Sequence, residues 1–478
     1  MRGIFFAIAA FGFSMVAVAQ SEDRTTGSAA RDALRQRIEA AQRELTATGA
    51  SSCSGSNCHS GGTPRPGEVF LATEWDLWWD RGQGSHFRAF KTLSSDRSER
   101  MAKILYGADA VAREAAQCRA CHALDAPKER QGGRFDIEDG VTCEACHGRS
   151  EKWLGPHQNA DQWRRKMTAQ QREAAGFLDL RDVVRRAEKC LECHAGTEEK
   201  RASHALMAAG HPTITLDLAT DLFSVPLHWK DRQSYLSESE GSWYHARVWA
   251  VGQAVALRES VRRLAVWAAS DDPPDLTLFE CYACHHDLDE SKNWRQRRGF
   301  EKTPGDPVWE SSAALLSRPL MDMFLPDAQA AFVERLAVLR KSVSIHGADR
   351  SAVRQAAEEL TAIADQLVAK VAACQFDFER TMRLARAVVD RSEEILAGGY
   401  RAAERAFRAL DALYRLAVAD SAHKPGNHDA IMKTLAEFEG ALYSTEGKEG
   451  SAKKEPAPQR YDPFLVREIL KKLAVQIG

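Results

Sequence analysis

Apolar residues recur at helical spacing throughout the part of the chain that follows residue 300. They return every three or four positions, and Ala, Leu, Arg and Glu dominate the composition between them. This period is typical of amphipathic helices that bury one stripe against each other, so the pattern indicates an up-and-down helical bundle. Helices are predicted over residues 328–343, 351–373, 378–396, 402–418, 430–442 and 463–477. A loop is predicted over 445–460, where Gly, Ser and Lys gather.

The preceding part of the chain shows a different pattern, with short helical stretches between polar loops that contain Gly and Pro. The helical period predicts helices over 31–45, 69–80, 109–120, 180–188 and, much longer, 243–269. No stretch of useful length alternates with the period of a strand. The predicted fold class is therefore all-α, with a loop-rich domain followed by a C-terminal helical bundle.

Cys-x-x-Cys-His occurs four times in the loop-rich part, and a looser copy with four residues between its cysteines precedes the other four. This is the attachment signature of a c-type haem, because two thiols meet the two vinyl groups of one porphyrin and the adjacent His binds the iron. The predicted thioether cysteines are Cys53 and Cys58, Cys118 and Cys121, Cys143 and Cys146, Cys190 and Cys193, and Cys281 and Cys284. The predicted proximal iron ligands are His59, His122, His147, His194 and His285.

Zinc binding and disulfide pairing are the alternatives for these cysteines. Zinc can use paired Cys-x-x-Cys units, but it does not require a His directly after every second Cys. Five covalently attached haem c groups are therefore expected. Every cysteine except Cys374 belongs to a motif, and a buried, inert thiol is expected at Cys374.

Further histidines gather in the same part of the chain as the motifs, whereas the predicted bundle contains only His346, His423 and His428. The clustered ones are His86, His157, His204, His211, His228, His245 and His286. Their clustering predicts distal iron ligands, although an ordinary surface or core histidine is the alternative for each one. Proximity to a motif favours iron ligation by the first four of these histidines. For His228 and His245, ligation and an ordinary structural role are equally weighted. His286 could only serve a haem other than that of His285. Two imidazoles make a six-coordinate relay haem, while a haem without the second one can bind a small molecule.

The N-terminus indicates export from the cytoplasm. Arg2 precedes an apolar run over residues 4–18, and Ala17-Val18-Ala19 has the small-x-small pattern of a cleavage site. We interpret residues 1–19 as a secretory signal peptide, with a retained membrane anchor as the alternative, and expect no membrane span after cleavage. A periplasmic or otherwise extracytoplasmic location follows. The formal net charge of −2 implies neither a nucleic-acid partner nor an acidic substrate.

The predicted organisation is a signal peptide at 1–19, an N-terminal helical spacer at 20–50, a pentahaem cytochrome c domain at 51–300 and a C-terminal helical bundle at 301–478. The order of the motifs over roughly residues 50–215 resembles cytochrome c-554 of the hydroxylamine oxidoreductase-like multihaem superfamily. The most specific part is Gly140-Val141, Glu144 and Gly148 around the third motif.

This resemblance implies closely paired haems that pass electrons along the protein. It implies that His157 serves the haem of His59 and His86 that of His147, with His204 or His211 serving that of His194. The haem of His122 is then the one without a strong distal ligand. The chain departs from the family pattern in its longer first motif, its fifth motif and its C-terminal helices, and no tyrosine stands out as a cross-link to a haem.

The leading functional hypothesis is a periplasmic pentahaem cytochrome that carries electrons between redox partner proteins. The first alternative is an oxidoreductase that acts on a small nitrogen or sulfur compound at a five-coordinate haem, that of His122. The second is a subunit whose bundle docks a larger oxidoreductase or a membrane-attached complex.

Overall fold

The computed structural model describes residues 37–38, 40–54, 59, 86–159, 161–197, 200–214, 217–218, 222, 243–281, 284–285, 307, 309–344, 347–419, 423–444, 455–457 and 461–478. The predicted signal peptide, the predicted helix at 69–80, Cys58, His228 and His286 lie outside these ranges. Within them most residues are helical, and extended structure is limited to isolated bridges and one two-residue pairing of β1 (Tyr443–Ser444) with β2 (Glu455–Pro456). The predicted all-α class is confirmed.

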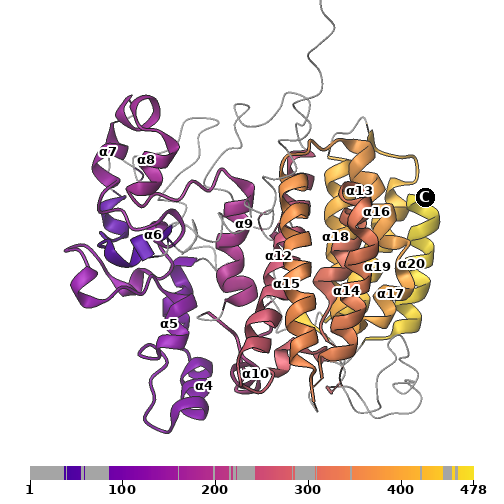
Figure 1. The fold of residues 1–478 in the computed structure, drawn as a ribbon, viewed down its shortest axis with the longest axis horizontal. Coiled ribbons are helices and arrows are strands. Elements are labelled where there is room, and N and C mark those ends of the chain that lie inside the picture. Colours follow the sequence, from indigo (N-terminus) through magenta and orange to yellow (C-terminus); the bar gives the residue numbers. More distant parts are fainter. Residues whose placement is uncertain are drawn as a thin grey trace, which may run out of the picture.

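The C-terminal helices pack side by side in one body (Figure 1). They are α13 (Ser312–Phe324), α14 (Gln329–Ser342), α15 (Arg350–Ala372), α16 (Phe378–Val389), α17 (Ser392–Ala397), α18 (Gly399–Ala417), α19 (His428–Leu442) and α20 (Pro463–Ile477). The side chains of Asp349, Asp377 and Asp462 accept hydrogen bonds from the first free amides of α15, α16 and α20, which fixes where these helices begin. Cys374, just beyond α15, is half-buried rather than buried.

Two features of this region differ from the prediction. The single helix expected over 378–396 is two helices, α16 and α17, because the chain turns at Asp390 and Arg391. Helix α13 was not predicted, and it contains Pro319, a residue that usually interrupts a helix.

The long helix α12 (Tyr244–Ala269) lies in the middle of the molecule, alongside α15 (Figure 1). Val248, Trp249, Val255 and Leu264 are fully buried, and the helix is apolar on most of its circumference. Such a helix belongs to a core. It shares one hydrophobic cluster with the C-terminal helices, so α12 packs as part of the bundle although it precedes residue 300. The domain boundary at residue 300 stays a prediction.

The N-terminal part consists of short helices, most of which lie away from the bundle (Figure 1). They are α3 (Ala89–Thr92), α4 (Asp96–Tyr106), α5 (Ala116–His122), α6 (Cys143–His147), α7 (Leu154–Gln158), α8 (Ala169–Ala174), α9 (Val183–Leu191) and α10 (His204–Ala208). Residues 40–44 are helical, as expected. The helix expected over 109–120 is the shorter α5, and α4 was not predicted. A small second hydrophobic cluster contains Phe90, Leu93, Ala102, Ala112 and Ala123.

Candidate haem-binding site

The second, third and fourth motifs each occupy the end of a helix. Helix α5 ends at His122, and α6 contains the whole third motif. Cys190 lies on the last turn of α9, and the π-helical turn η6 (Glu192–Gly196) carries His194. In the fifth motif, the amide of His285 donates to the carbonyl of Cys281 at 2.8 Å, which closes the turn. A single helical turn places both thiols and the following imidazole on neighbouring positions, as covalent haem attachment requires.

Four of the five motif histidines face a second histidine that belongs to no motif. Their ring centroids lie 6.0 to 6.3 Å apart. The pairs, with the angles between their ring planes, are His59 with His157 at 20°, His122 with His211 at 90°, His194 with His86 at 81°, and His285 with His204 at 34°.

These distances fit an iron between each pair of rings. A metal–imidazole bond of about 2 Å on each side, with each ring centroid about 1.1 Å beyond its nitrogen, gives a separation of about 6.2 Å. Edge-to-face aromatic contact without a metal covers a wider range, about 4.5 to 7 Å. The separation stays nearly constant while the interplanar angle varies from 20° to 90°. The residues present therefore fit four haem irons with two imidazole ligands each.

Hydrogen bonds orient one of these pairs directly. Nδ1 of His122 lies 2.8 Å from the carbonyl oxygen of Ala89, and Nδ1 of His211 lies 2.7 Å from that of Pro212. A ring that donates from Nδ1 presents Nε2 to a metal, which fixes both the tautomer and the orientation of the ligand.

Burial keeps most of these imidazoles neutral. Desolvation lowers the pKa of His59, His86, His147, His157, His194 and His211. For His86, the nearby His194 lowers the pKa further. The neutral imidazole is the form that binds a metal, so burial favours the ligating state.

The motif cysteines lie next to each other in two groups. The thiols of Cys53 and Cys143 are in contact, and so are those of Cys121 and Cys193. The first motif therefore lies beside the third, and the second beside the fourth. This is the kind of close pairing that the sequence resemblance implied.

The third motif histidine, His147, has different surroundings. Its ring lies parallel to that of Phe177, with 5.9 Å between centroids and 7° between planes. Phe177 belongs to an aromatic cluster with Trp153 and Trp163, which also touches His157.

The pairing expected from the family resemblance differs from the structure. His86 faces His194 rather than His147, and His122, expected to lack a partner, faces His211. His204 faces His285 of the fifth motif, which the family pattern does not include. The reason is that the partner of a motif histidine is set by packing between segments distant in the sequence, which the order of the motifs does not specify. His157 faces His59, as the resemblance implied.

The remaining candidate, His245, lies on α12 against Tyr244, with 5.4 Å between ring centroids. His228 and His286 are outside the described ranges.

Glu144, inside the third motif, has a role that its position in the sequence did not reveal. The side chain is 2% exposed and accepts hydrogen bonds from three backbone amides, those of Thr48 at 3.0 Å, Gly49 at 2.8 Å and Ser150 at 2.7 Å. It thereby holds the segment that leads into Cys53 against the third motif. The pattern of hydrophobic residues in the sequence could not reveal this role, because the only signal is a single carboxylate within a haem motif.

The glycine after the same motif is required by close packing. Gly148 has a φ of 84°, and a Cβ there would lie 2.1 Å from the carbonyl oxygen of Gly176. Any other residue would combine a disfavoured backbone conformation with a steric clash. Glu144 and Gly148 thus each have a structural role at this motif, Glu144 through its hydrogen bonds to backbone amides and Gly148 through its close approach to the Gly176 carbonyl.

Cys-x-x-Cys-His turns with histidine pairs at the spacing of an axially ligated iron define a c-type cytochrome. Residues 56–148 match the family model described as cytochrome c554 and c-prime. The match includes the second and third motifs and the end of the first, and it confirms the resemblance drawn from the motif order. No curated protein and no solved structure matches the chain.

The family assignment indicates covalently bound haem c and a role in electron transfer with redox partners. None of the helices in the described ranges combines the length and the apolar character that a bilayer span requires.

Proposed function

We propose that the chain is an extracytoplasmic pentahaem cytochrome that relays electrons between redox partner proteins. The observation that carries this proposal is the set of four histidine pairs, each joining a motif histidine to a second imidazole at 6.0 to 6.3 Å. Two imidazoles occupy both axial positions of an iron, which leaves no position for a substrate and favours electron relay.

The haem groups supply one-electron redox chemistry, and the protein supplies their attachment, ligation and spacing. The ten motif cysteines would form the thioether bonds, and the motif histidines would be the proximal ligands. His157, His211, His86 and His204 would be the distal ligands of the first, second, fourth and fifth haems. The contacts between Cys53 and Cys143 and between Cys121 and Cys193 support close spacing of the haems within each group.

The location outside the cytoplasm rests on the family and on the predicted signal peptide, residues 1–19, which lies outside the described ranges. The redox partners are proposed by chemical class only, as proteins that donate or accept single electrons. We propose no membrane-spanning segment in the protein after the signal peptide is cleaved.

The test uses the holoprotein. Its intact mass gives the number of haems per chain, and an electron paramagnetic resonance spectrum of the oxidised form gives the spin state of the irons. We expect five haems per chain and at least four low-spin ferric irons. Fewer than four haems, or a majority of high-spin irons, would overturn the relay.

A second candidate function is an oxidoreductase that acts on a small nitrogen or sulfur compound. The observation in its favour is the surroundings of the third motif, where the ring of His147 lies parallel to that of Phe177 with 5.9 Å between their centroids. This places the candidate site at the third motif instead of the second. A high-spin ferric signal from one iron that changes on addition of nitric oxide, nitrite or hydroxylamine would support it, whereas five low-spin irons would exclude it.

A further inference from the structure

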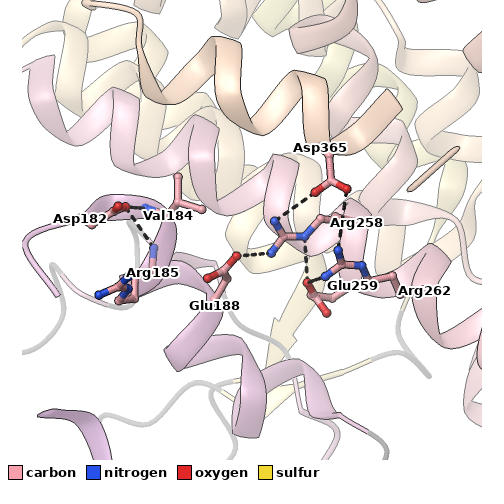
Figure 2. A network of polar contacts seen from close by, with 8 residues as sticks. All are labelled: Asp182, Val184, Arg185, Glu188, Arg258, Glu259, Arg262 and Asp365. Atoms are coloured by element: carbon pink, nitrogen blue, oxygen red, sulfur yellow. Dashed lines mark hydrogen bonds and ion pairs between the residues drawn. The ribbon is translucent and has the colours of Figure 1, made fainter. Parts of the chain in front are cut away.

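The fourth motif is anchored at its N-terminal end by an arginine of the bundle. Arg258 of α12 donates from Nη2 to Oε1 of Glu188 at 2.6 Å, and Glu188 lies two residues before Cys190 (Figure 2). The same guanidinium contacts Glu259 at 2.9 Å and Asp365 of α15 at 3.4 Å. The side chain of Arg258 is 2% exposed and that of Glu188 is 28% exposed, so this contact between α9, α12 and α15 is partly buried.

A second arginine of α12 holds the other end of the motif. Arg263 donates from Nη1 to the carbonyl oxygen of Ala195, the residue directly after His194. Burial lowers the pKa of the Arg263 guanidinium. The two arginines lie five positions apart on one helix and thus contact the chain on both sides of Cys190–His194.

Apolar contacts attach the same segment to the bundle. Ala187 and Leu191 of α9 are buried in the hydrophobic cluster that contains α12 and the C-terminal helices. Helix α9 lies between the N-terminal helices and the bundle (Figure 1). His86, which faces His194, comes from the N-terminal part. The fourth haem position is therefore a junction, with one imidazole anchored to the bundle and the other held by the N-terminal helices.

The charges of this contact are matched. Arg258 and Arg262 face Glu188, Glu259 and Asp365, and Arg262 contacts both Glu259 and Asp365. Burial by itself lowers the pKa of Arg258, but the neighbouring carboxylates of Glu259, Glu188 and Asp365 raise it above the ordinary value. Removing one partner of such a buried group leaves the others uncompensated.

We propose that Arg258 and Arg263 are positioning residues that hold the fourth motif at both ends and so keep His194 opposite His86. The C-terminal bundle would then be a scaffold for the electron path rather than a separate docking module. This inference deepens the proposed function and rests on His86 and His194 being the axial ligands of one haem.

The experiment uses the complete holoprotein. The variant His86→Met first identifies the low-spin signal and the midpoint potential of this haem, because it changes one axial ligand. If His86→Met changes no low-spin signal, the ligand assignment within the proposed function fails, and the inference fails with it. The arginines are tested separately, with Arg258→Met, Arg258→Lys and Arg263→Met. Arg354→Met, which removes an exposed arginine paired with Glu358 on α15, is the control.

The expected result for Arg258→Met and Arg263→Met is a broadened or weakened signal and a shifted potential for the haem identified by His86→Met, with the other haems unchanged. Arg258→Lys keeps the positive charge but loses the planar guanidinium group, so this variant should retain the parent signal and potential only in part. Arg354→Met should have the same low-spin signals and midpoint potentials as the parent protein. An unchanged signal and potential in both Met variants would overturn the proposal. An unchanged signal and potential in Arg258→Lys together with altered ones in Arg258→Met would also support the proposal, since an ion pair with Glu188 would then be enough to hold this end of the motif.

Discussion

The carboxylate of Glu144 offers a quantitative test of how the first and third motifs are held together. Its Oε1 accepts from the amides of Thr48 and Ser150, and its Oε2 accepts from the amide of Gly49 at 2.8 Å. In Glu144→Gln the amide oxygen can keep the first two contacts. The amide nitrogen then points at the N–H of Gly49, so two donors face each other.

The cost follows from the contacts that change. One hydrogen bond to a charged acceptor is worth about 1.5 to 3 kcal/mol, and a buried donor left unsatisfied costs about 1 to 3 kcal/mol, although these two quantities overlap. We therefore expect opening of the segment around Thr48 and Gly49 to become easier by about 2 to 4 kcal/mol. At 1.4 kcal/mol for each factor of ten, this predicts amide exchange that is about 30- to 1000-fold faster.

The assay is hydrogen exchange followed by mass spectrometry on peptides that cover residues 45–53. Glu129→Gln, at an exposed position in the same part of the chain, is the matched control and should leave these peptides unchanged. Exchange of the 45–53 peptides in Glu144→Gln within about threefold of the parent rate would refute the reasoning, because it would mean that the carboxylate does not hold this segment.

Three more predictions follow from single features of the structure. The rings of His59/His157 and His204/His285, with 20° and 34° between their planes, should give rhombic low-spin resonance signals. The near-perpendicular rings of His122/His211 and His86/His194 should give two signals of large anisotropy, because parallel ligand planes split the iron d orbitals more widely. Four signals of one type would contradict this. Gly148→Ala should sharply reduce the yield of folded holoprotein, since its Cβ would lie 2.1 Å from the Gly176 carbonyl, whereas Gly155→Ala, with open space around it, should fold normally; equal yields would contradict the packing argument. Burial raises the pKa of Glu310, but Arg405 and Arg401 outweigh it and lower the pKa overall, so its contribution to stability is present above its ordinary pKa and disappears as the pH falls through the lowered value. Glu310→Gln should therefore flatten the acid side of the plot of unfolding temperature against pH, and an unchanged slope would argue against this coupling.

Much of this fold could be predicted from the sequence because the signals are local. The period of apolar residues located α12, α15 and α20 within one or two residues of their observed ends. Helix α13 escaped prediction because Pro319 contradicts its helical pattern and only tertiary packing overrides it. The haem motifs are equally local, since the chemistry of attachment needs two thiols and an imidazole within one turn.

The histidine partners could not be derived in the same way. His86 and His194 meet because α9 is fixed to α12 and α15, which depends on Arg258 reaching Glu188 from a distant part of the chain. The family resemblance placed His157 opposite His59, but it paired His86 with the wrong motif. A fifth motif supplies a new partner for His204, and this possibility has no local signature in the sequence.

The arrangement of the pairs implies that haem ligation and tertiary folding are coupled. Thioether bonds would attach a haem to a single motif, whereas the second imidazole would come from another segment, since the ring of His211 faces His122 and that of His204 faces His285. Each completed pair therefore cross-links two segments of a region whose own hydrophobic cluster is small. The bundle has a large apolar core and does not need such cross-links. Loss of a distal histidine should accordingly loosen the N-terminal helices and leave the bundle folded, because only the former depend on ligation for their packing.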